Sequence, residues 1–265
     1  MRKISRNKDI NGHLAKYEFL ACKNEGELEI KTQHGSVYDK IYRKAELYLD
    51  TRQNDVHVSL SYDFACRLLA HYPNADEEIV LPAIVLHDVG WKLVPEEKQL
   101  SAFGPKVKDK KTQRIHETEG VKIAEEILTL LNYDKEKILE ILSIIDGHDT
   151  RQEALSLNDQ LVKDADKLWR FTPVGVDIDH TRFGILRDSY MKWLGTVIDD
   201  WLFTLEAREM ALAALAEAKA HDGLSVIHVP VYCGDDPLGG MGAYGSWNVG
   251  NWVEDVQAKY IKQNI

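Results

Sequence analysis

Apolar and polar positions follow a helical period through the middle of the chain. Between about residues 40 and 170, apolar side chains return every three or four positions, as on a helix with one buried face. The pattern predicts five or more helices, with polar, turn-forming breaks at residues 71–78, 94–106, 131–137 and 149–159. A run rich in Ala, Leu and Glu predicts one further, flanking helix over residues 199–220.

Strand-like patterns occur only outside this helical region. Residues 224–233 have strand character, and residues 26–38 could supply a second short strand beside them. The glycine-rich segment 234–251 lacks the lysine of a phosphate-binding loop, so we interpret it as a connector or a lid. The predicted fold is mainly all-α, a helical bundle with extra flanking helices and a small β-hairpin near the C-terminus.

Composition limits the classes of partner. The 265 residues, 44% of them hydrophobic, suffice for one main domain. A formal net charge of −10 argues against a nucleic-acid polymer as partner, because binding to its phosphates requires a basic surface. The cysteines are widely spaced, at Cys22, Cys66 and Cys233. No apolar run resembles a signal peptide or a membrane span. We expect a cytoplasmic protein with reduced thiols and no membrane partner; an oligomer is compatible with the sequence.

Histidines interrupt the apolar faces of the predicted helices. His57, His116 and His148 each stand in register with the apolar residues of their own helix. His87 ends the apolar run "IVL" and is followed directly by Asp88. All four imidazoles are therefore predicted to point inward. On the predicted helix of His116, three polar side chains are predicted to point away from the core: Glu117, Glu119 and Lys122.

The same helical period distinguishes two aspartates near residue 165. Asp166 shares a stripe with Val162 and Trp169, whereas Asp164 falls off that stripe with its lysine neighbours, Lys163 and Lys167. We therefore expect Asp166 to face the core and Asp164 not to.

Buried imidazoles and carboxylates are costly unless they are paired or bind a metal. A single histidine of this kind is more often a core residue with a hydrogen-bond partner. That interpretation is less favoured for four histidines and two aspartates on successive helices. Six ligands are too many for one catalytic ion and suit two ions bridged by a carboxylate, for which Asp88 is the natural choice. Because the set contains no cysteine, manganese or iron is favoured over a structural zinc.

The ordered residues resemble the HD-domain superfamily, whose dinuclear members have the pattern H…HD…H…H…D. The matching residues are His57, His87, Asp88, His116, His148 and Asp166. The resemblance covers about residues 50–175. We accordingly divide the chain into an N-terminal extension (1–45), an HD metal-dependent phosphohydrolase domain (46–175) and a C-terminal helical extension with the glycine-rich loop (176–265), packing on the same domain.

The resemblance implies hydrolysis of a small phosphate ester or phosphoanhydride, commonly a nucleotide, by a hydroxide that bridges two divalent ions. Manganese and iron are the first candidates, ahead of zinc, nickel and magnesium. Asp88 would be the bridging ligand at the catalytic centre. Two alternatives remain open: a mixed-valence di-iron oxygenase of the same fold, and a non-catalytic nucleotide-binding HD protein.

Three cations near the ligands are candidates for binding the substrate phosphate. Lys92 follows Asp88 by one helical turn and is the first choice, for both substrate binding and catalysis. Arg114 precedes His116, and Arg151 follows His148. Each of the three could equally be a solvated surface residue.

Overall fold

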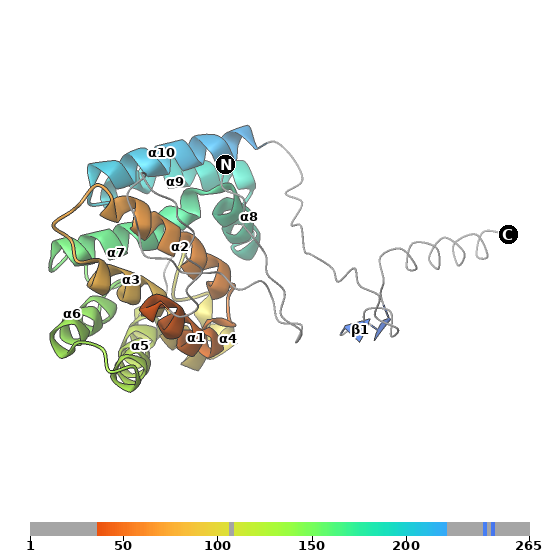
Figure 1. Ribbon diagram of the computed structural model, residues 1–265. Coiled ribbons are helices and arrows are strands. Elements are labelled where there is room, and N and C mark those ends of the chain that lie inside the picture. Colours follow the sequence, from red (N-terminus) through yellow and green to blue (C-terminus); the bar gives the residue numbers. More distant parts are fainter. Residues whose placement is uncertain (1–35, 106–108, 222–240, 243–244, 247–265) are drawn as a thin grey trace. The chain divides into compact units, whose positions relative to one another are not determined.

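The computed structural model describes residues 36–105, 109–221, 241–242 and 245–246. The described part of the chain is mainly helical, so the predicted all-α fold is confirmed (Figure 1). The α-helices are α1 (Val37–Leu49), α2 (Asn54–Leu69), α3 (Glu77–Leu86), α4 (Glu96–Gln99), α5 (Lys110–Leu130), α6 (Lys135–Ile145), α7 (Leu157–Leu168), α8 (Pro173–Arg182), α9 (Arg187–Trp201) and α10 (Leu205–Ala220). Two short 3-10 helices are η1 (Val89–Leu93) and η2 (Trp169–Phe171).

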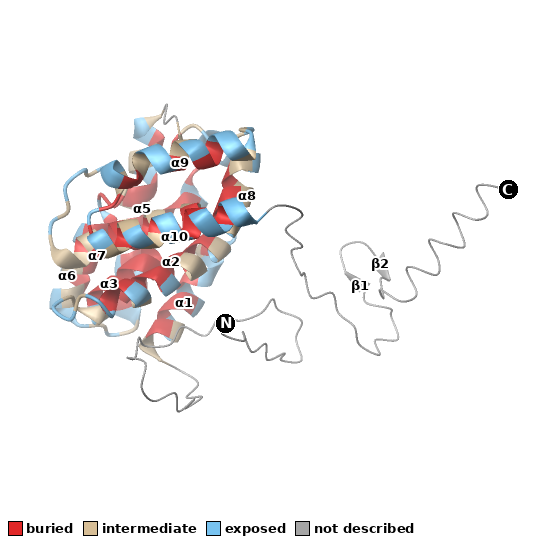
Figure 2. Cartoon of the chain, turned by 90° about the horizontal axis from the view of Figure 1, so that it is seen from above, coloured by how far each residue is buried: buried red, intermediate tan, exposed pale blue. Residues whose placement is uncertain are grey.

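Helix α3 lies at the centre of the bundle. Every residue from Ile79 to Leu86 is buried, because α1, α2, α6 and α7 all pack against it. Figure 2 shows the buried residues along the inner sides of the helices and the exposed residues outside. Full burial of each large aliphatic side chain contributes roughly 1.5–3 kcal/mol. The residues that follow α3 are therefore held in a rigid setting.

Most of the helices begin at a polar residue whose side chain caps the first turn. In each case a side-chain oxygen accepts a backbone N–H of that turn, a contact of about 1 kcal/mol. The capping residues are Ser36, Asp76, Asp109, Asp134, Ser156, Thr172 and Thr204. The local sequence therefore determines where these helices begin.

The flanking helix predicted over residues 199–220 is two helices, α9 and α10, so that prediction is wrong in its extent. The break is fixed by Asp164, whose carboxylate accepts hydrogen bonds from Phe203 N (2.7 Å), Thr204 N (3.0 Å) and Thr204 Oγ1 (2.6 Å). Asp164 is fully buried, although the helical period predicted it off the buried stripe. It is buried against the start of α10 because α7 contacts α10 as well as α2 and α3.

The C-terminal unit, residues 223–265, contains the small antiparallel hairpin predicted there, β1 (Met241–Gly242) with β2 (Gly245–Ser246). The strand predicted at 224–233 lies outside the described residues, as does most of the one at 26–38. The last residues of the latter begin α1 instead. Cys22 and Cys233 lie outside the described residues, so the expectation of reduced thiols stays a prediction.

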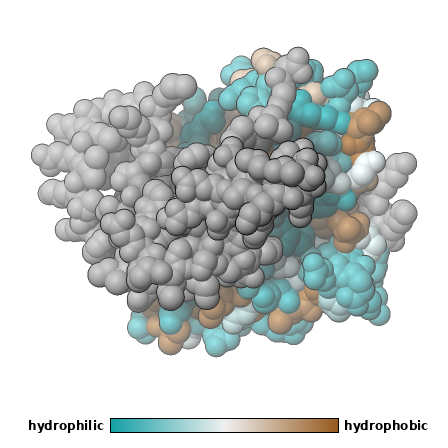
Figure 3. Space-filling model, turned by 90° about the vertical axis from the view of Figure 1, so that its right-hand side faces the viewer, coloured by the Kyte–Doolittle hydropathy of each residue, from teal (hydrophilic) through white to brown (hydrophobic). Residues whose placement is uncertain are grey.

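The surface of the described residues is mixed. On the face shown in Figure 3, hydrophilic side chains surround separate apolar patches. Singly exposed leucines such as Leu47, Leu139 and Leu186 are ordinary on a folded surface. Among the described residues, no helix has the length and apolar content needed to cross a membrane.

Candidate metal centre

Five helical elements bring the six predicted ligands together, and all six side chains are buried. His57 is on α2, His116 on α5 and Asp166 on α7. His87 and Asp88 follow the last residue of α3, and His148 lies in the turn after α6. The prediction that these side chains face inward is confirmed for each of them.

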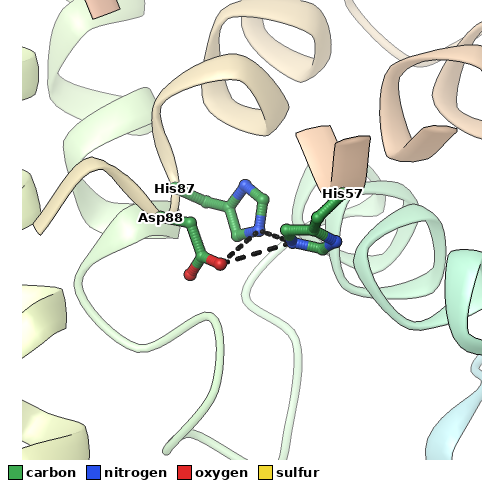
Figure 4. A group of neighbouring side chains, drawn as sticks. All are labelled: His57, His87 and Asp88. Atoms are coloured by element: carbon green, nitrogen blue, oxygen red, sulfur yellow. Dashed lines mark hydrogen bonds and ion pairs between the residues drawn. The ribbon is translucent and has the colours of Figure 1, made fainter. Parts of the chain in front are cut away.

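The first group of donors is formed by His57, His87, Asp88 and Asp166. The Nε2 atoms of His57 and His87 lie 2.9 Å apart, and Asp166 Oδ1 lies 3.3 and 3.4 Å from them. Asp88 Oδ2 is 3.4 Å from His57 Nε2 and 3.8 Å from His87 Nε2. Figure 4 shows His57, His87 and Asp88 pointing toward one another.

The second group is formed by Asp88, His116 and His148. The Nε2 atoms of the two histidines lie 3.2 Å apart. The other oxygen of the same carboxylate, Asp88 Oδ1, is 3.8 Å from His116 Nε2 and 3.5 Å from His148 Nε2. Each oxygen of Asp88 therefore faces a different pair of histidines.

In two of the imidazoles, a backbone carbonyl fixes the ring and the proton on Nδ1. His87 Nδ1 lies 2.9 Å from the carbonyl oxygen of Ile84, and His148 Nδ1 lies 2.9 Å from that of Ile145. A carbonyl can only accept, so both Nδ1 atoms carry a proton, and Nε2 is the ring nitrogen left to bind a metal when it is unprotonated. Metal-binding histidines commonly make this contact with their second ring nitrogen.

The donor atoms fit a divalent cation. Imidazole and carboxylate ligands bind such ions at about 2.0–2.2 Å, which places two donors of one tetrahedral ion about 3.4 Å apart. The observed separations within the two groups, from 2.9 Å between His57 and His87 to 3.8 Å between His87 and Asp88, bracket that value. The cluster can therefore hold divalent metal.

The two carboxylates of the cluster are ionised at neutral pH. Burial acts to raise the pKa of Asp88, but the charge of His87 and the contact with His148 outweigh it and hold that pKa well below its usual range. Burial acts likewise on Asp166, where the charge of Lys167 opposes it and keeps the pKa well below the ordinary value. The resulting negative charge favours a bound cation.

Trp91 supports the cluster from η1, a role that the sequence reasoning missed. Its Nε1–H donates to Asp88 Oδ1 at 2.9 Å, and its ring stacks on His116 with centroids 4.0 Å apart. The only signal in the sequence was its position three residues after Asp88, which is within reach across one helical turn.

Asp149 and Lys167 also border the cluster and were missed as site residues. Asp149 Oδ2 lies 3.7 Å from His116 Nε2, and Lys167 Nζ pairs with both Asp149 (2.6 Å) and Asp166 (2.5 Å). Lys167 was predicted to lie off the buried stripe, yet its ammonium joins the two carboxylates.

Glu117 and Lys163 are buried, although both were predicted to point away from the core. Glu117 accepts the backbone N–H groups of Asp149 (3.0 Å) and Thr150 (2.8 Å). Lys163 Nζ donates to three carbonyl oxygens of the same turn at 2.8–2.9 Å, those of Gly147, His148 and Arg151. Both side chains hold the turn that carries His148, which explains why they are buried.

The three cations predicted to bind phosphate have other partners. Lys92 pairs with exposed Asp50, Arg114 with Glu117 and Asp146, and Arg151 with Asp159. Within the described residues, no hydrogen bond or ion pair joins Lys92, Arg114 or Arg151 to any of the six ligands. Their part in substrate binding therefore stays a prediction that this geometry does not favour.

Comparison with known proteins assigns the segment that carries this cluster to a domain family. The family model of the HD domain matches residues 56–170, a segment that contains all six ligands. This segment is an HD domain. The HD domain includes most of α2 and continues into η2, whereas α1 and α8–α10 lie outside the match. HD domains form a superfamily of metal-dependent phosphohydrolases. No curated protein and no solved structure matches the chain significantly.

Proposed function

We propose that the protein hydrolyses a small phosphate ester or phosphoanhydride, with nucleotides as the first substrate class to test. The observation that carries the proposal is the arrangement around Asp88, whose Oδ2 faces His57 and His87 and whose Oδ1 faces His116 and His148. A carboxylate with one oxygen toward each of two donor groups is the ligand that a pair of ions requires.

The donor set favours two divalent ions. His57, His87, Asp88 and Asp166 would hold the first, and Asp88 with the remaining histidine pair would hold the second. Nitrogen and oxygen donors without sulfur favour manganese or iron, with zinc, nickel and magnesium next. When bound, such ions lower the pKa of a water molecule and polarise the phosphate oxygens.

The protein's own contribution is to orient these donors. Trp91 Nε1–H fixes the carboxylate of Asp88, and the Ile84 and Ile145 carbonyls fix the rings of His87 and His148. Because Asp88, His87 and His148 are each held by packing and by a hydrogen bond from outside the cluster, these three ligands need little reorganisation when the substrate binds.

The test combines elemental analysis of the purified full chain with a panel of mononucleotides, dinucleoside polyphosphates and sugar phosphates. We expect about two metal ions per chain and metal-dependent phosphate release from one class. Asp88→Asn should lose metal and activity together, whereas Asp55→Asn, on an exposed position of α2, should retain both.

Two outcomes would contradict the proposal. Iron-dependent oxygen consumption without phosphate release would identify an oxygenase. A metal-loaded protein that binds a nucleotide but turns over no member of the panel would identify a non-catalytic binding protein.

A further inference from the structure

Arg52, between α1 and α2, is a half-buried cation, and two of its side-chain nitrogen atoms have no hydrogen-bond partner among the described residues. Its Nε and Nη1 atoms are inaccessible to solvent, and neither has a partner among the described residues. The guanidinium lies between two aromatic rings, with Cζ 4.0 Å from the Trp91 centroid and 3.8 Å from that of Phe103. The rings stabilise the charge, but they leave the N–H donors of Nε and Nη1 unpaired. Buried donors are normally satisfied, so a water, an ion or a ligand is expected beside these two nitrogen atoms.

The backbone at this position is strained. Arg52 and Gln53 have φ values of 54° and 58°, in the left-handed region that residues other than glycine rarely adopt. Such conformations cost on the order of 1–3 kcal/mol each and persist where the surroundings enforce them. Here Arg182 Nη2 donates to the Arg52 carbonyl oxygen at 2.6 Å, while Arg182 Nη1 is held by buried Asp179. The fold therefore maintains the direction of the Arg52 side chain at the expense of backbone strain.

Arg52 lies between the metal centre and a cavity. The Trp91 ring that contacts its guanidinium also stacks on His116 and donates to Asp88. Arg52 lines a cavity of about 500 Å³, which also borders Lys92 and contains none of the six ligands. This volume suits a small molecule. Burial lowers the pKa of Arg52 to about 10, with the charge of Asp88 opposing, so the side chain is positively charged at neutral pH.

We propose that Arg52 binds the phosphoryl group of the substrate while the metal centre acts on it. The guanidinium offers donors and no acceptor, and its planar fork matches two phosphate oxygens. Lys92 borders the same cavity but already has a carboxylate partner in Asp50. Arg52 therefore replaces Lys92 as the first candidate for phosphate recognition. This inference rests on the proposed function.

The experiment measures calorimetric binding of inorganic phosphate to the metal-loaded full chain, dialysed to remove free ions. Arg52→Met should weaken phosphate binding at least tenfold, about 1.4 kcal/mol, without changing the metal content. Arg43→Met, at an exposed position of α1, is the matched control and should bind phosphate as the wild type does. If Lys92 were the phosphate ligand, Lys92→Met would give the large loss and Arg52→Met would not.

A second variant keeps the inference testable if Arg52→Met does not fold. Arg52→Lys keeps the charge but not the planar fork, so it should show an intermediate loss of phosphate affinity with normal metal content. Wild-type affinity in a folded Arg52 variant would overturn the inference and leave the proposed function intact. A metal-loaded wild type that neither binds phosphate nor hydrolyses the panel would instead overturn the proposed function, and the inference with it.

Discussion

Replacing Gly90 with alanine should separate two elements that the metal centre requires in contact. Gly90 lies in η1, two residues after Asp88, where η1 packs against α5. A Cβ atom at this position would lie 1.9 Å from the carbonyl oxygen of His116 and 2.5 Å from Gly120 N. Both neighbours are backbone atoms of a helix, so neither can move aside as a flexible side chain would.

The size of the effect follows from the overlap. A relaxed C···O contact is about 3.3 Å, so η1 or α5 would have to move by roughly 1.4 Å at Gly90. Overpacking of this kind costs typically 1–3 kcal/mol, and a backbone clash belongs at the upper end. In a chain of this size each kcal/mol lowers the melting temperature by about 2–4 °C, so we expect a decrease of roughly 5–10 °C. Because the shift separates Asp88 from His116, metal affinity should fall as well.

Gly120→Ala is the matched control, because it faces the same contact from α5. There a Cβ would meet Ile145 Cγ2 at 3.4 Å and the His87 carbonyl oxygen at 3.5 Å, both ordinary contacts. Alanine also favours a helix interior by roughly 0.5–1 kcal/mol over glycine. Thermal denaturation and metal titration of both variants provide the test. Equal melting temperatures and metal affinities in the two variants would refute the reasoning.

Three further predictions concern the residues around the ligands. Trp91→Phe keeps the aromatic packing but removes the donor to Asp88, and we expect a 10- to 100-fold loss of metal affinity, measured by metal titration; unchanged affinity would contradict the role of Nε1. Asp166→Ala should lose metal and activity, whereas Asp164→Ala should keep the metal but lower the melting temperature, because the start of α10 loses its acceptor; metal loss in both variants would reverse that assignment. Lys163→Met leaves three carbonyl groups without their donor and should cost roughly 1–3 kcal/mol in chemical denaturation, and an unchanged midpoint would count against that role.

The sequence alone determined the helical character of residues 40–170 and the inward direction of the six ligands. Each of these features depends on one helix at a time. His57, His116 and Asp166 share a stripe with apolar residues, and a residue three or four positions from a buried side chain must follow it into the core. The spacing of the apolar residues therefore predicted the inward-facing ligands without any knowledge of how the helices pack.

Only the tertiary structure decided which other polar residues are buried. A single stripe describes a helix with one neighbour, but α7 contacts α2, α3 and α10, so Lys163 and Asp164 are buried on its further faces. Arg52 lies in the short connection before α2, where no period applies. Its contact with Trp91 joins residues 39 positions apart in sequence, and such a pairing depends on packing between elements rather than on any local pattern.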